Sequence, residues 1–109
     1  MNKPFKGIRI TGLDLLRTAR SPKSSRLRHI HLTLSDTPPR EWIEFFNQER
    51  SVPRQLWRHA WIEGRYIVVD CVPEEIDRHL SDLKEEVESA NKMIIALAAK
   101  REEALVRRR

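Results

Sequence analysis

The sequence predicts a two-layer α+β domain in which a four-stranded, mainly antiparallel sheet carries a short helix and a long C-terminal helix on one face. Alternating apolar residues and a turn glycine indicate short strands in the first 72 residues, and a heptad pattern indicates a long helix in the last third. The order strand–strand–helix occurs twice, which gives a ββαββα arrangement. The order of the strands within the sheet cannot be derived from the sequence.

The first two strands are predicted from apolar residues at every second position. One covers residues 6–16 and the other residues 27–35, where Ile30 and Leu32 alternate with polar side chains. The polar stretch 17–26 between them is expected to be a mobile loop. The face of the second strand opposite its apolar residues carries His29, His31 and Thr33.

A short helix over residues 38–50 follows from the sequence Thr37-Pro38-Pro39. Thr37 suits the N-cap, and Pro38 suits the first helical position, where its missing N–H leaves no hydrogen bond unmade. Pro53 cannot continue the helix, so it is expected to end near residue 50.

A β-hairpin is predicted over residues 57–62 and 66–72. Gly64 can take the positive φ that a tight hairpin turn requires. The return strand is β-branched and apolar on both faces, which is typical of a central strand.

The last third predicts one helix over residues 73–106, with apolar residues in alternating steps of four and three. At 1.5 Å per residue this helix would be roughly 50 Å long, whereas the other 72 residues form a domain only about 25–30 Å across. Part of the helix must therefore extend beyond the domain. Asn91 favours helix only weakly, so a break there is an alternative. We divide the chain into one domain over 1–91 and a helical extension over 92–109. The heptad seam consists of Ile76, Leu80, Leu83, Val87, Ala90, Ile94 and Leu97.

Composition favours a cytoplasmic globular protein. Its 39% hydrophobic and 34% charged residues exclude wholesale disorder. No apolar run approaches the ~20 residues that cross a bilayer, and the N-terminus lacks the apolar stretch of a signal peptide. The single cysteine, Cys71, excludes an internal disulfide and fits a reducing compartment.

The net charge of +5 is concentrated near the N-terminus. Residues 1–28 hold eight Lys and Arg against one acid, whereas residues 29–73 and 74–109 each have a net charge of −1. A local basic patch can attract polyanions. Where arginines are interleaved with Trp57 and Trp61, the aromatic rings can stack on bases while the arginines contact phosphates. The candidate nucleic-acid-binding residues are Arg17, Arg20, Lys23, Arg26, Arg28, Arg54 and Arg58.

No motif in the sequence specifies catalysis, a metal or a cofactor. His29 and His31 point the same way, but His59 could join them at a metal only if its strand were their neighbour. The acids show no paired spacing and the three glycines are isolated. The two glutamates that follow Cys71 oppose a thiolate there. We therefore expect no enzyme activity, no cofactor and no metal.

The strongest functional signal is the apolar segment near the end of the long helix. Met93, Ile94, Ile95 and Leu97 leave nearly every side of the helix apolar, which is costly in water at about 25 cal/mol per Å². We expect these residues to bind a second copy or another protein. The leading hypothesis is a non-enzymatic interaction module without membrane contact, and the alternative is a nucleic-acid-binding accessory protein.

Overall fold

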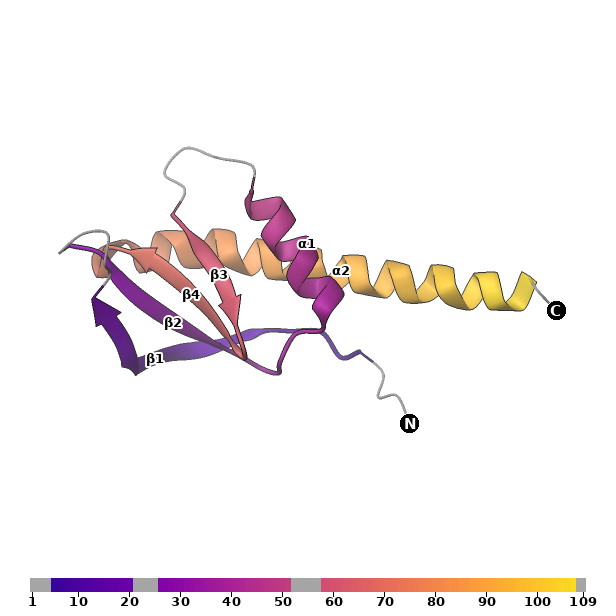
Figure 1. Ribbon diagram of the computed structural model, residues 1–109, viewed down its shortest axis with the longest axis horizontal. Coiled ribbons are helices and arrows are strands. Elements are labelled where there is room, and N and C mark those ends of the chain that lie inside the picture. The colour runs from indigo at the N-terminus through magenta and orange to yellow at the C-terminus, as the bar shows by residue number, and fades with distance from the viewer. Residues whose placement is uncertain (1–4, 21–25, 52–57, 108–109) are drawn as a thin grey trace.

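The computed structural model describes residues 5–20, 26–51 and 58–107 and confirms the predicted α+β fold (Figure 1). The predicted order of strands and helices is also observed. The elements are β1 (Ile10–Arg20), β2 (Arg28–Leu34), α1 (Arg40–Arg50), β3 (Ala60–Glu63), β4 (Tyr66–Cys71), the short 3-10 helix η1 (Pro73–Glu75) and α2 (Ile76–Arg107).

The sheet has the strand order β1-β2-β4-β3, and each neighbouring pair is antiparallel. β4 thus lies inside the sheet, and its residues from Ile67 to Cys71 are all buried. The strand predicted to be central is central because it has apolar side chains for both faces. The β3–β4 hairpin turns at Gly64, whose φ of +60° is rarely adopted by an L side chain.

β1 differs from its predicted bounds at both ends. It was expected over 6–16, yet it begins at Ile10 and continues to Arg20. The loop prediction is therefore wrong for residues 17–20, which belong to β1; after a shift in register, Ala19 pairs with His29 and Arg20 with Arg28. The backbone hydrogen bonds gained with β2 at the end of this segment outweigh the preference of its polar residues for a loop. Residues 21–25 of the predicted loop lie outside the described part of the chain.

The start of α1 also differs from the prediction. Pro39, without a side-chain cap, precedes the first helical residue, and the first helical hydrogen bond runs from Ile43 N–H to the Pro39 carbonyl at 3.1 Å. Thr37 is not the N-cap. Its backbone N–H instead donates to Asp36 Oδ1 at 2.8 Å, in the segment before the helix.

One hydrophobic core joins the inner face of the sheet to both helices. Trp42 and Phe46 of α1 are fully buried and stack with their ring centroids 5.5 Å apart. The predicted seam of α2 faces this core, where Leu83, Val87 and Ala90 are buried and Ile94 packs against the cluster. The strand residues in the core are Ile30, Leu32, Leu34, Ala60, Ile67, Val69 and Cys71.

Helix α2 runs unbroken from Ile76 to Arg107, so the chain has no break at Asn91. It passes behind the sheet and α1 and continues well past both (Figure 1). The molecule measures 60 × 29 × 21 Å, and its radius of gyration of 16.1 Å exceeds the roughly 13 Å of a compact chain of this length. No helix within the described ranges is both long enough and apolar enough to cross a membrane.

Candidate interaction surface

Asn91 joins three segments at the point where α2 approaches the edge of the domain. Its Oδ1 accepts hydrogen bonds from the Ile8 backbone N–H and from Trp42 Nε1–H, both at 2.9 Å. Its Nδ2 donates to the Ile8 carbonyl at 2.8 Å. Asn91 is 8% exposed, and these bonds satisfy the polar atoms that its burial removes from water. They hold the N-terminal segment and α1 against the same stretch of α2.

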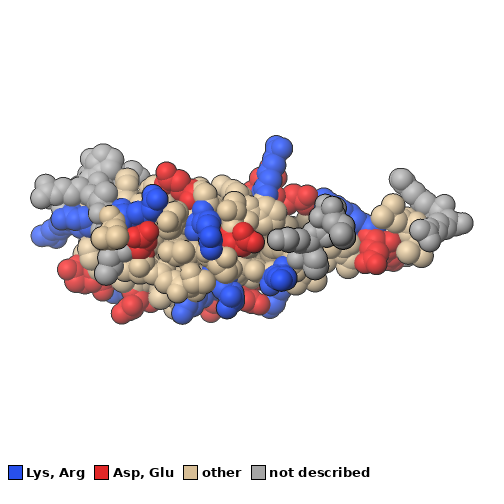
Figure 2. Space-filling model, turned by 90° about the horizontal axis from the view of Figure 1, so that it is seen from below, with Lys and Arg blue, Asp and Glu red and all other residues tan. Residues whose placement is uncertain are grey.

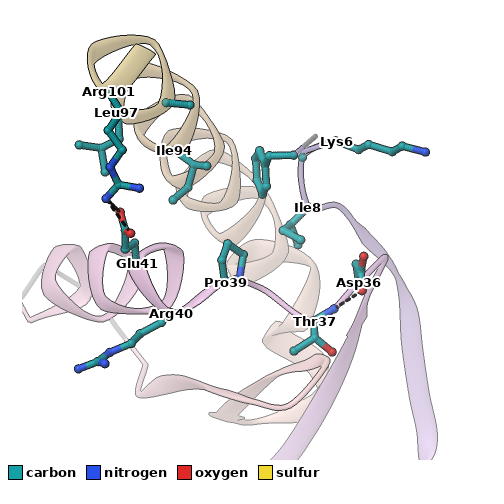
Figure 3. A pocket seen from close by; sticks show the side chains of 13 residues that line it. Lys6, Ile8, Asp36, Thr37, Pro39, Arg40, Glu41, Ile94, Leu97 and Arg101 are labelled. Atoms are coloured by element: carbon teal, nitrogen blue, oxygen red, sulfur yellow. Dashed lines mark hydrogen bonds and ion pairs between the residues drawn. The ribbon is translucent and has the colours of Figure 1, made fainter. Parts of the chain in front are cut away.

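Beyond Asn91 these three segments leave a groove of about 860 Å³ (Figure 3). The N-terminal segment Phe5–Ile8 lies on one side of it and the start of α1 lies on the other, while Asp36 and Thr37 of the preceding loop lie below Ile8. At the left of Figure 3, one guanidinium nitrogen of Arg101 donates to both carboxylate oxygens of Glu41, at 2.9 and 3.0 Å. The groove residues of α2 are Ile94, Leu97, Ala98 and Arg101.

The four residues predicted to bind a partner have different environments. Ile94 packs against the core, Leu97 lines the groove, and Met93 is half-buried. Ile95 is 58% exposed. The first half of the predicted patch therefore contributes to the domain itself, and the exposed apolar surface begins at Ile95.

Two exposed apolar residues further along α2 were not predicted. Leu105 and Val106 are each 66% exposed. The heptad seam stops at Leu97, because the next seam positions hold Arg101 and Ala104, and the apolar residues beyond them were therefore missed. The missed signal is spacing, because Leu105 follows Ile94 by eleven residues, about three turns, and so lies on the same side of the helix.

A second exposed apolar area lies on the edge strand β1. Leu16 is 98% exposed and Leu13 is also exposed. β1 has a free edge in the four-stranded sheet, and its register shifts twice against β2. Such irregularities interrupt the regular edge that another strand would need for pairing.

The open face of the sheet gathers histidines and larger aromatic rings. His29 meets Trp61 edge to face at 5.3 Å between centroids, and His31 meets Tyr66 in the same way at 5.5 Å. β4 separates His59 from the strand of His29 and His31. Within the described ranges, no group of three His, Cys, Asp or Glu side chains could hold a metal ion.

Arg17 and Arg58, both candidate nucleic-acid-binding residues, are paired with acids. Arg17 Nε lies 3.5 Å from Asp14 Oδ2, and its guanidinium lies over the Tyr66 ring at 4.9 Å. Arg58 lies 3.3 Å from Glu75. On the face seen in Figure 2, Lys and Arg are interspersed with Asp and Glu rather than gathered into one basic patch.

Three of the other candidate arginines, Arg20, Arg26 and Arg28, lie in or next to β1 and β2. Arg20 in β1 is opposite Arg28 in β2, whose Nη1 donates to the Leu27 carbonyl at 2.9 Å. Arg26 is exposed just before β2. Lys23, Arg54 and Trp57 lie outside the described residues.

Cys71 is buried at the end of β4, where it packs in the core. Burial raises the pKa of its thiol to about 11, and the negative charge of Glu75 acts in the same direction. The thiol is therefore protonated near neutral pH, and a protonated, inaccessible thiol is a poor nucleophile.

His79 in the first turn of α2 is buried and lies 3.3 Å from Glu75 Oε2. This hydrogen bond, together with the charge of Arg58, holds the pKa of the Glu75 carboxyl below its usual range. The start of α2 is thus tied to the strand side of the domain through Glu75.

Comparisons with protein-family models, with curated proteins and with solved structures found no match to the chain. The fold and the groove define the molecule as a small α+β domain whose last helix extends beyond its own core. Where that helix leaves the core, its apolar side chains change from buried to exposed without a change in helical spacing.

Proposed function

We propose that the protein is a non-enzymatic interaction module that self-associates through residues 92–107 of α2. The observation that carries this proposal is the continuity of the core-facing stripe. Leu83 is buried, Ile94 packs against the core and Leu105 is exposed, although they lie on one side of the helix at intervals of eleven residues. The same apolar face therefore serves first the core and then a second copy.

The exposed end of α2 needs a packing partner to be a stable helix. Residues 101–106 are all exposed. Helices gain most of their stability from packing an amphipathic face, and isolated segments shorter than about 12–15 residues are marginal in water. A second copy would supply the missing packing and would bury Ile95 and Leu105.

The expected affinity is modest. Burying Ile95 and Leu105 in two copies involves four large side chains at about 1.5–3 kcal/mol each, or roughly 6–12 kcal/mol in all. Association costs an estimated 4–15 kcal/mol. Since a Kd of 1 μM corresponds to about −8.2 kcal/mol, we expect a dimer with a Kd of micromolar or weaker.

Sedimentation equilibrium from about 10 μM to about 1 mM protein spans this range of Kd. The intact chain should shift from monomer to dimer, and Leu105→Asp should be monomeric throughout because it places a charge in the interface. Leu16→Asp is the matched control, since it makes the same change at the exposed edge of β1. The proposal fails if the intact chain is monomeric at every concentration, or if Leu16→Asp rather than Leu105→Asp abolishes the dimer.

The alternative function, nucleic-acid binding, is supported by the open sheet face, where Arg17 lies over Tyr66. Fluorescence anisotropy with labelled single-stranded DNA and RNA at low salt tests it. Binding there should weaken steeply with salt and should be lost in Tyr66→Ala, because stacked bases need the ring. Absence of binding at high micromolar protein would exclude this alternative.

A further inference from the structure

We infer that the second copy binds antiparallel, so that the exposed end of α2 of each copy lies in the groove of the other. The two-fold axis would pass between residues 99 and 100 of the paired helices. This inference rests on the proposed self-association and adds its geometry. Three properties of the groove and of the helix end support it: spacing, length and charge.

The spacing along α2 is the same when it is read from either end. Ile94, Ala98, Arg101 and Leu105 follow one another in steps of four, three and four on one side of the helix. In an antiparallel pair, Ile94 would therefore lie opposite the partner's Leu105, and Ala98 opposite the partner's Arg101. The small Ala98 side chain leaves room for the aliphatic stem of arginine, while its guanidinium can stay at the solvent edge.

The length of the exposed helix end matches the length of the groove. The groove follows α2 from Ile94 to Arg101, which is roughly 12 Å at 1.5 Å per residue. The part of α2 beyond Arg101 runs to Arg107, which is roughly 9 Å. In this register the partner's residues 102–105 lie along the groove, opposite residues 97–94, so the groove takes Leu105, and Val106 reaches just past its Ile94 end.

The charges at the sides of the groove also fit a second copy. The N-terminal segment lies on the side of α2 that bears Asn91, because Asn91 bonds to Ile8. Glu102 follows Asn91 by eleven residues and so lies on that same side. A two-fold axis between antiparallel helices places the same side of both helices next to each other. With the axis between residues 99 and 100, the partner's Glu102 is level with residue 97. There it would lie beside the backbone of Lys6, which lines the groove; the exposed Lys6 side chain extends away from α2 in Figure 3 and would turn towards the partner's Glu102 on association.

Glu41 provides the matching charge on the other side of the groove. It already binds Arg101 of its own chain through both carboxylate oxygens. In the antiparallel pair the partner's Arg101 would be level with Ala98, one turn of helix away from the first. Each Glu41 carboxylate would then lie between two guanidinium groups, and its negative charge would offset the repulsion between the two arginines across the axis.

Charge reversal at Lys6 and Glu102 tests the register. No ion pair joins these two described and exposed side chains within one copy, so neither substitution removes a contact of the monomer. Lys6→Glu or Glu102→Lys alone would place like charges together twice in each dimer. Each should raise the Kd measured by sedimentation equilibrium at low salt by about tenfold. The double variant should restore the Kd of the intact chain to within about twofold.

Lys92→Glu is the matched control, because it makes the same charge change on the side of α2 away from the stripe and should leave the Kd unchanged. Circular dichroism at protein concentrations well above each Kd should show the helix content of the intact chain in all variants. If the single reversals leave the Kd unchanged, or if the double variant fails to restore it, the antiparallel register is refuted. Self-association itself then still stands provided that Leu105→Asp dissociates the dimer; if it does not, the proposed function fails as well.

Discussion

Replacing Asn91 by leucine should weaken the whole domain, because this one side chain joins three segments. The variant leaves three buried groups without their partner: the N–H and C=O of Ile8 and the indole N–H of Trp42. An unsatisfied buried polar group costs about 1–3 kcal/mol, and the leucine recovers part of this by burying more apolar surface. We expect the free energy of unfolding to fall by about 3–5 kcal/mol, a large share of the 5–15 kcal/mol typical of a domain.

Urea unfolding followed by tryptophan fluorescence measures this loss. The measurement belongs in a Leu105→Asp background, because association would otherwise add to the apparent stability. Lys92→Leu is the matched control: it introduces leucine at the exposed neighbouring position and should change stability by no more than about 0.5 kcal/mol. In Asn91→Leu the Ile8 amide should also exchange faster with solvent. A loss below about 1 kcal/mol would refute the view that Asn91 holds the N-terminal segment in place.

Four further predictions concern ion pairs and ionisation. Arg50 donates to both carboxylate oxygens of Glu86, at 2.7 and 2.6 Å. Arg50→Met leaves the Glu86 charge without this partner, so it should lower the free energy of unfolding, measured in urea, by about 3–5 kcal/mol. The double variant Arg50→Met/Glu86→Leu should lose less, and an equal loss would contradict this pairing. Because burial raises the pKa of Cys71 from 9.0 to about 11, iodoacetamide at about pH 8 should label it only in denaturant. Stability should also fall as pH rises from 9.0 towards 11, since the unfolded thiol ionises first. The lowered pKa of Glu75 contributes stability that is present above 4.5 and lost as pH falls through its folded value. Glu75→Gln should therefore weaken the acid dependence of the melting temperature, and an unchanged pH profile would count against the contact with His79.

The long helix was predictable because its signal is local and repeated. The residues from Ile76 to Leu97 recur at helical spacing, and a window of that length outweighs single weak helix formers such as Asn91. What the pattern could not show is which turns face the core. Ile94 and Leu105 share one side of the helix, yet the domain ends between them.

The polar contacts of the groove could not be predicted. Asn91 looked like a weak point of the helix because propensity is a property of isolated segments. Its role comes from Ile8 and Trp42, which are 83 and 49 residues away along the chain. The same holds for Arg101 and Glu41, whose pairing depends on how α1 crosses α2.

By itself, the sequence determined the type and order of the elements, because periodicity, turn glycines and proline positions act over a few neighbouring residues. The tertiary structure alone decided the strand order, the true bounds of β1 and the groove beside Ile94. Those features depend on backbone and side-chain groups that satisfy one another across long stretches of chain, and no local pattern records such pairings. The apolar end of α2 needed both sources of information. Its residues could be read from the sequence, but only the fold shows that they are exposed.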